Sequence, residues 1–149
     1  MTRGLELSNY VGHLIRRAEQ VHTALWVQHV SRDITSQQFA VLNALRQEPG
    51  IDQRTLAHHA SLDRSTISQM VRRLTHQGYL SQVRDEEDRR RTLLCLTDEG
   101  TALLDSLIPA AKRINDQLLE SLSDDERIVA TDIFRKIASL DHEPLGGAH

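Results

Sequence analysis

The chain of 149 residues has little of several features that would mark particular protein classes. It contains one cysteine, Cys95, so no disulfide can form within the chain and we expect a reducing, cytoplasmic location. No apolar run approaches the roughly 20 residues that a membrane-spanning helix needs, and the N-terminus lacks the apolar segment of a signal peptide. Because only 3% of the residues are aromatic, the core must be mostly aliphatic.

Motifs that would indicate an enzyme or a metal protein are also missing. The sequence has no glycine-rich phosphate loop, no nucleophile elbow and no HExxH motif, so we expect no enzymatic activity and no cofactor. Among its eight histidines, only His22 and His29 would share a helical face. No carboxylate or cysteine set completes a tetrahedral site, which leaves metal sensing as an unfavoured alternative. Cys95 lies in a predicted strand, where a small apolar role is favoured over a thiol switch.

Charge is distributed unevenly along the chain, which has a formal net charge of -3. The segment 61–91 carries seven arginines and five acids, a net charge of +2, whereas the segment 98–126 carries eight acids and two bases, a net charge of -6. A locally basic segment in an acidic chain is typical of a confined nucleic-acid footprint.

Apolar spacing and capping signals predict a mainly helical protein with one small β-hairpin. The predicted order is a helix over 8–30, a helix opened by the capping box at 35–38, a short helix over 52–60, a helix over 63–77, strands at 79–84 and 92–96, a long helix capped by Thr97, and a last helix from 123 to about 140. Pro109 is expected to kink the long helix. The short helix, the helix after it and the hairpin together predict a winged helix-turn-helix.

This order divides the chain into four regions. Residues 1–34 form an N-terminal helix, residues 35–97 the winged helix-turn-helix lobe, residues 98–141 two C-terminal helices, and residues 142–149 a disordered tail. The apolar stripes of the outer helices are too extensive for the small lobe to cover. We therefore expect these helices to pack against a second copy of the chain and form a homodimer.

The helix over 63–77 has one apolar and one polar face. Its apolar face follows the spacing i, i+3, i+4, i+7 at Ile67, Met70, Val71 and Leu74. Its polar face joins small hydroxyls and an amide to arginines, a set that suits base edges and phosphates and that we assign to DNA contact: Arg64, Ser65, Thr66, Ser68, Gln69, Arg72 and Arg73. A plain solvated face is the first alternative. The second is a winged-helix adaptor for proteins, which would favour acids or exposed apolar groups here.

The stretch "VRDEEDRRRTLLCLT" places four acids directly before three arginines between the two predicted strands. A solvated loop explains such a run, and so does a finger whose acids restrain DNA-binding arginines. We assign Arg84, Arg89, Arg90 and Arg91 to the DNA-contacting set, with Arg84, Arg89 and Arg91 as phosphate or loop-bracing residues.

The segment 50–100 resembles the multiple antibiotic resistance regulator (MarR) family. The matching features are "TISQMVRRL", "GYL" and a wing signature D-x-x-D-x-R followed by L-T-x-x-G, which falls on Asp85, Asp88, Arg90, Leu96, Thr97 and Gly100. The resemblance implies a homodimer that binds a pseudo-palindromic operator in double-stranded DNA as a repressor and is released by a small molecule. It also implies that Arg90 enters the minor groove, and that Asp85 and Asp88 pair with nearby arginines.

A narrower resemblance concerns "GHLIRRAEQVHTALW", which is similar to family members that control aromatic-acid catabolism. It implies that Arg16 and His22 hold an aromatic carboxylate, with Trp26 as an apolar wall and with His13 and Tyr10 in the same site. Arg16 and His22 lie about 600° apart on a helix, so they would meet only across a pocket with other walls. Alternatively, Arg16 forms a dimer salt bridge and His22 is an interface histidine, or the protein controls efflux or stress genes through another phenolic or metal effector.

Overall fold

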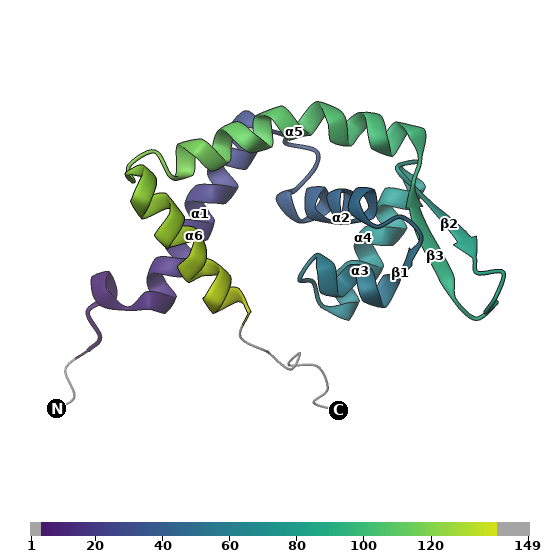
Figure 1. Ribbon diagram of the computed structural model, residues 1–149, viewed down its shortest axis with the longest axis horizontal. Coiled ribbons are helices and arrows are strands. Elements are labelled where there is room, and N and C mark those ends of the chain that lie inside the picture. The colour runs from purple at the N-terminus through teal and green to yellow at the C-terminus, as the bar shows by residue number, and fades with distance from the viewer. Residues whose placement is uncertain (1–3, 140–149) are drawn as a thin grey trace.

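The computed structural model describes residues 4–139 and shows a helical protein with one small sheet (Figure 1). The predicted tail at 142–149 lies outside the described residues. The elements are η1 (Leu7–Asn9), α1 (Val11–His29), α2 (Ser36–Gln47), β1 (Ile51–Asp52), α3 (Gln53–His59), α4 (Arg64–His76), β2 (Leu80–Arg84), β3 (Thr92–Leu96), α5 (Asp98–Leu118) and α6 (Asp124–Ala138). In Figure 1, α5 runs along the top and joins a lobe of α2, α3, α4 and the sheet to the end of the molecule where α1 and α6 overlap in this view. The predicted winged helix-turn-helix is confirmed.

The sheet has three antiparallel strands in the order β1-β3-β2. The predicted hairpin pairs Arg84 with Thr92 and Leu80 with Leu96. No pattern in the sequence indicated β1, a strand of two residues in which Ile51 pairs with Leu94. This short strand matters because it brings the start of α3 next to the base of the wing, which consists of β2, β3 and the loop 85–91 between them.

The lobe encloses an aliphatic core, as the scarcity of aromatic residues predicted. Its side chains come from α2, α3, α4, all three strands and the first half of α5: Val41, Leu42, Ala44, Leu45, Ile51, Leu56, Ile67, Val71, Leu74, Leu80, Leu94 and Leu104. The predicted apolar stripe of α4 is confirmed, with Met70 only partly buried at its edge. The lobe and the first half of α5 therefore share one contiguous apolar core within one chain.

Most predicted helix starts are confirmed by side-chain caps. Thr35 and Ser123 each form the expected capping box, and Thr97 accepts from the backbone N–H of Gly100 at 3.0 Å. The predicted start of the first helix at Ser8 is wrong, because a turn of 3-10 helix precedes α1 and no side chain caps it. Helix α5 continues through Pro109, so the proline does not divide it.

The junction between the sheet and α5 explains the glycine of the L-T-x-x-G motif. The hydroxyl of Thr97 donates to the carbonyl of Gly78 at 2.6 Å, and its backbone N–H donates to the carbonyl of Tyr79 at 3.1 Å. A Cβ atom on Gly100 would collide with that same carbonyl oxygen of Tyr79. Only glycine therefore lets α5 begin this close to the end of α4.

Candidate nucleic-acid interface and effector region

Helix α4 begins at a cap that also engages one of the predicted DNA contacts. Asp63 accepts from the backbone N–H of Thr66 at 2.8 Å and from its hydroxyl at 2.6 Å. These two bonds, the hydroxyl bond being the stronger cause, hold the pKa of the Asp63 carboxyl below its usual range. The Thr66 hydroxyl is therefore occupied in positioning the helix, whereas its neighbours on the same face are not.

The polar face of α4 is open to solvent. Arg64, Ser65, Gln69, Arg72 and Arg73 are exposed. Within the described part of the chain, no ion pair involves the three arginines of this face. Their charges consequently remain available to a polyanion, while the buried opposite face fixes the helix on the core.

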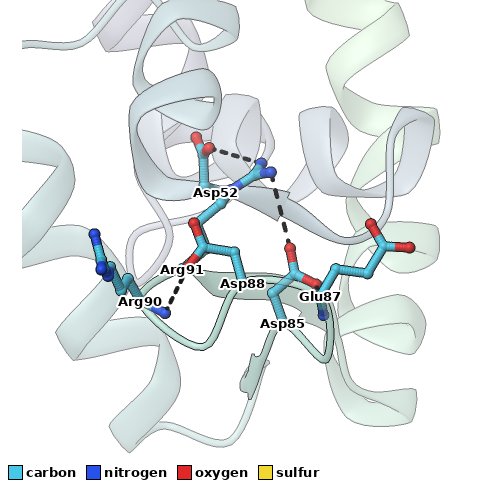
Figure 2. Close-up of polar contacts among 6 residues, drawn as sticks. All are labelled: Asp52, Asp85, Glu87, Asp88, Arg90 and Arg91. Carbon is cyan, nitrogen blue, oxygen red and sulfur yellow. Dashed lines mark hydrogen bonds and ion pairs between the residues drawn. The ribbon is translucent and has the colours of Figure 1, made fainter.

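The wing separates its arginines into different environments. The guanidinium of Arg84 donates to the carbonyl of Arg89 at 3.1 Å, which braces the loop. Asp88 accepts from the backbone N–H of Arg90 at 3.1 Å. We expected this acid to pair with an arginine side chain, but it binds the main chain instead. Figure 2 shows the side chain of Arg90 directed away from the acids. This acid–backbone bond leaves the side chain of Arg90 projecting from the loop.

Arg91 differs from the other wing arginines because its guanidinium contacts two carboxylates (Figure 2). It lies 3.0 Å from Oδ2 of Asp52 and 3.8 Å from Oδ2 of Asp85. The expected pairing of Asp85 with an arginine is confirmed. Sequence reasoning missed Asp52 as a partner, since it precedes Arg91 by 39 residues and only the unforeseen pairing of β1 with β3 brings them together.

Two of the predicted effector residues meet at the boundary between α1 and the lobe. Trp26 is buried and donates its indole N–H to the carbonyl of Ile34 at 2.6 Å. Its ring packs against Phe39 of α2 at 5.1 Å and against His22 at 6.3 Å between ring centroids. Trp26 can therefore offer an apolar wall to a ligand, but its donor is already satisfied.

Arg16 lies apart from that aromatic group. It lines an open groove of about 610 Å³ along α1, together with Glu19, Gln20, Thr23, Ala24, Val27, Gln28 and Arg32. His22 is not among the lining residues, as the helical rotation between the two positions requires. Tyr10 and His13 lie at the start of α1, where the Tyr10 ring covers Gly12. One chain thus does not bring the five expected effector residues into one cavity.

Two other kinds of site are absent from the described part of the chain. Residues 4–139 hold no cluster of three or more His, Cys, Asp or Glu side chains that would suit a metal ion. None of the helices described is both long and apolar enough to cross a membrane. The polar face of α4, the wing and the α1 region are the parts of the structure from which we infer the function.

Comparison with known proteins identifies relatives with this architecture. The profile of the MarR family matches residues 34–92. The transcriptional repressor NicR of Pseudomonas putida is 36% identical over 137 residues, which cover 91% of this chain and 87% of NicR. Relatives of this kind are named as transcriptional regulators, not as enzymes, in agreement with the absence of enzyme motifs from the sequence.

Solved structures agree with this assignment. PcaV from Streptomyces coelicolor, in complex with its natural ligand, is 45% identical and superposes with a TM-score of 0.89 over 93% of this chain and 99% of PcaV. BpsR from Bordetella bronchiseptica, whose DNA binding is regulated by 6-hydroxynicotinic acid, is 32% identical with a TM-score of 0.80 over 86% and 98% of the two chains. A mutant of MarR from Escherichia coli, bound to operator DNA, is 26% identical with a TM-score of 0.79 over 85% and 92%.

Proposed function

This protein is a DNA-binding transcriptional regulator that belongs to the MarR family, and we propose that it is a homodimeric repressor released from its operator by an aromatic carboxylate. The open polar face of α4, whose arginines have no carboxylate partners among residues 4–139, carries the DNA-binding half of this proposal. MarR, a relative of the same fold, is known in complex with operator DNA. We place the protein in the cytoplasm, where such an operator is accessible.

We assign the DNA contacts to two elements. On α4, we assign Ser65, Ser68, Gln69 and Arg72 to base edges or nearby phosphates and Arg64 and Arg73 to phosphates, while Thr66 fixes the start of the helix through its bonds to Asp63. On the wing, Arg90 enters the minor groove, where narrow A·T-rich DNA attracts arginine, while Arg84 and Arg89 support the loop or meet phosphates. Two copies of α4 would then read half-sites one helical turn apart, about 34–36 Å.

Two helices outside the lobe support the dimer. Helix α6 has no buried residue, and five of its apolar side chains are exposed: Ile128, Val129, Ile133, Phe134 and Ile137. Helix α1 buries only Trp26 and exposes Val11, Leu14, Ile15, Val21 and Val27. Apolar surface of this extent on two helices is typical of an interface, and a second copy of the chain is the partner we propose.

The DNA-binding half is tested by a salt titration on a duplex that the wild-type protein selects from a random-sequence library. Affinity should fall steeply as salt rises. Arg72→Ala should weaken binding by about 1–3 kcal/mol. The control, Arg113→Ala, removes an exposed arginine of α5 and should bind like wild type. Full affinity of Arg72→Ala would contradict the assignment of α4.

For the effector, we propose a site between the dimerisation helices and the lobe, in which Arg16 pairs with the carboxylate and His22 and Trp26 contact the ring. BpsR, whose DNA binding responds to 6-hydroxynicotinic acid, supports this class of ligand. The groove at Arg16 is open in one chain, and we propose that the partner closes it. Binding would favour a lobe spacing that mismatches the operator, which requires different affinities for the two spacings.

Thermal-shift screening against hydroxybenzoates, related pyridine carboxylates and uncharged phenols tests the effector. An aromatic acid at 100 times its Kd should stabilise the protein by about 2.7 kcal/mol and release DNA. Arg16→Ala should lose this stabilisation. The matched control is Arg17→Ala, since Arg17 is an exposed arginine at the next position that does not line the groove. If phenols act and carboxylates do not, the effector class is wrong while DNA binding stands.

A further inference from the structure

Arg91 connects three parts of the lobe that are separate in sequence. Its guanidinium reaches Asp52 at the start of α3 and Asp85 at the end of β2. Its main chain closes the wing loop as well, because its carbonyl accepts from the N–H of Asp85 at 3.0 Å and its N–H donates to the carbonyl of Asp88 at 2.9 Å. Arg91 is thus fixed to the wing by its backbone and to the helix-turn-helix by its side chain.

Asp52 has two functions at once. Its Oδ1 accepts from the backbone N–H of Thr55 at 2.8 Å and so caps α3, while its Oδ2 accepts from Arg91 at 3.0 Å. As a member of β1, Asp52 also pairs with Leu93 of β3, two residues after Arg91. The ion pair therefore joins the first helix of the helix-turn-helix motif to the base of the wing, at a point where the backbone contact is only a strand of two residues.

We propose that Arg91 is a positioning residue, which holds the wing to α3 through Asp52 and Asp85 and so aims Arg90, rather than a contact to DNA phosphate. The inference rests on the proposed DNA-binding function of the wing. Two carboxylates already neutralise Arg91, so a phosphate would have to displace them. Arg90 has no carboxylate partner in the described structure and remains the arginine that reaches DNA.

The two roles of Arg91 predict opposite effects when the charge of Asp52 is removed. Asp52→Asn keeps the helix cap, because Asn and Asp are equally good at this position, but it weakens the attraction to Arg91. If Arg91 positions the wing, DNA affinity falls, by about two- to fivefold for a pair that is half-exposed on the arginine side. If Arg91 binds phosphate, losing Asp52 releases it and affinity rises.

Glu86→Gln is the matched control for the loss of one negative charge. Glu86 is an exposed acid of the same wing loop, but no arginine pairs with it in the described residues. Glu86→Gln should therefore bind DNA with unchanged or slightly higher affinity. If DNA affinity falls only in Asp52→Asn, the loss is caused by the broken ion pair and not by the change in net charge.

The salt dependence of Arg91→Gln gives a second, independent measurement. Loss of a phosphate contact flattens the slope of log K against log salt by about 1, whereas loss of a positioning residue leaves the slope at the wild-type value. Hydrogen exchange at the amides of Asp85 and Arg91, which close the loop, should also accelerate in Asp52→Asn without DNA. A structural role elsewhere in the protein would not produce this local change.

The experiment compares four variants on the library-selected duplex: Asp52→Asn, Glu86→Gln, Arg91→Gln and Arg90→Ala. The proposal holds if Asp52→Asn and Arg90→Ala weaken binding, Glu86→Gln does not, and Arg91→Gln keeps the wild-type slope. Tighter or unchanged binding by Asp52→Asn, or a flattened slope for Arg91→Gln, overturns it. If Arg90→Ala binds like wild type, the proposed function of the wing fails instead.

Discussion

Large apolar side chains are buried in the lobe but exposed on the outer helices, α1 and α6. Leu74 in the lobe is 0% exposed, whereas Phe134 on α6 is 54% exposed. The lobe surrounds its aliphatic core with four helices and a sheet from one chain. Helices α1 and α6 lie at the other end of α5 (Figure 1), and Trp26 is the one buried residue that these two helices contain. The lobe thus buries its apolar side chains within one chain, whereas we propose that the outer helices bury theirs against a second copy.

The two regions are joined at a few defined points. Helix α5 contributes Leu104 to the core of the lobe, and Ile114 is buried farther along the same helix. Trp26, the one buried residue of α1, is tied to Ile34 and packs against Phe39 at the start of the lobe. A change in how the outer helices pack would therefore reach the lobe through α5 and Trp26, which is what the release that we propose would require.

The largest expected effect is on the free energy of unfolding. Its dependence on protein concentration should differ between substitutions in the lobe and substitutions in the outer helices. Leu74→Ala should lower the free energy of unfolding by about 2–5 kcal/mol, since it leaves a cavity in a closed core. This loss should be the same at all protein concentrations. Phe134→Ala should destabilise the protein through dimer dissociation, so its effect should grow on dilution. Urea unfolding at several concentrations measures both.

Val83→Ala is the control for Phe134→Ala, because Val83 is exposed to the same 54% but lies on the wing strand β2. It should leave the oligomeric state unchanged in sedimentation experiments. If Phe134→Ala proves as independent of concentration as Leu74→Ala, the outer helices do not form the interface we propose.

A smaller effect is expected where the lobe meets α5. Gly100→Ala places a Cβ atom against the carbonyl oxygen of Tyr79 and should cost about 1–3 kcal/mol through overpacking. Gly50→Ala meets no atom within 4 Å but has a φ of +78°, so only backbone strain of about 1–2 kcal/mol applies. Gly4→Ala lies in open space and should be neutral. Equal losses for Gly100→Ala and Gly4→Ala would mean that α5 can shift away from Tyr79.

Prediction from sequence succeeded where the signal was local. The caps Thr35, Asp52, Thr97 and Ser123 are each followed within three residues by the group that they bind, so their role is visible in the sequence. The apolar stripe of α4 repeats with the helical period, and it is buried as predicted. The winged helix-turn-helix follows from these local signals and from the order of the elements.

Prediction failed where the signal depended on distant pairing. Strand β1 has two residues, too few for any alternation, and its pairing with β3 is what brings Asp52 to Arg91. The charge run of the wing indicated that some acids restrain arginines but not which ones. Asp88 binds a backbone N–H instead of a guanidinium, a choice that depends on loop geometry. The separation of Arg16 from His22, in contrast, follows from helix rotation alone.

The smallest expected effect concerns stability in acid. Aspartates are the N-caps of two helices of the lobe, whereas the N-caps of the outer helices α1 and α6 are Tyr10 and Ser123. Hydrogen bonds from Thr55, and then the neighbouring Arg91, hold the pKa of Asp52 below its ordinary value of 3.8. A lowered pKa contributes stability that is complete above 3.8 and is lost as the pH falls through the folded-state pKa.

Arg91→Gln should raise the pKa of Asp52 only part of the way to that ordinary value, because the bonds from Thr55 are the larger cause and they remain. The pKa of Asp63, which depends on Thr66, should stay unchanged and serves as the internal control. Carboxyl chemical shifts followed by NMR over an acid titration measure both groups in one sample. An unchanged pKa of Asp52 in Arg91→Gln would show that the ion pair does not persist in solution, and the wing would then be held by β1 and its loop hydrogen bonds alone.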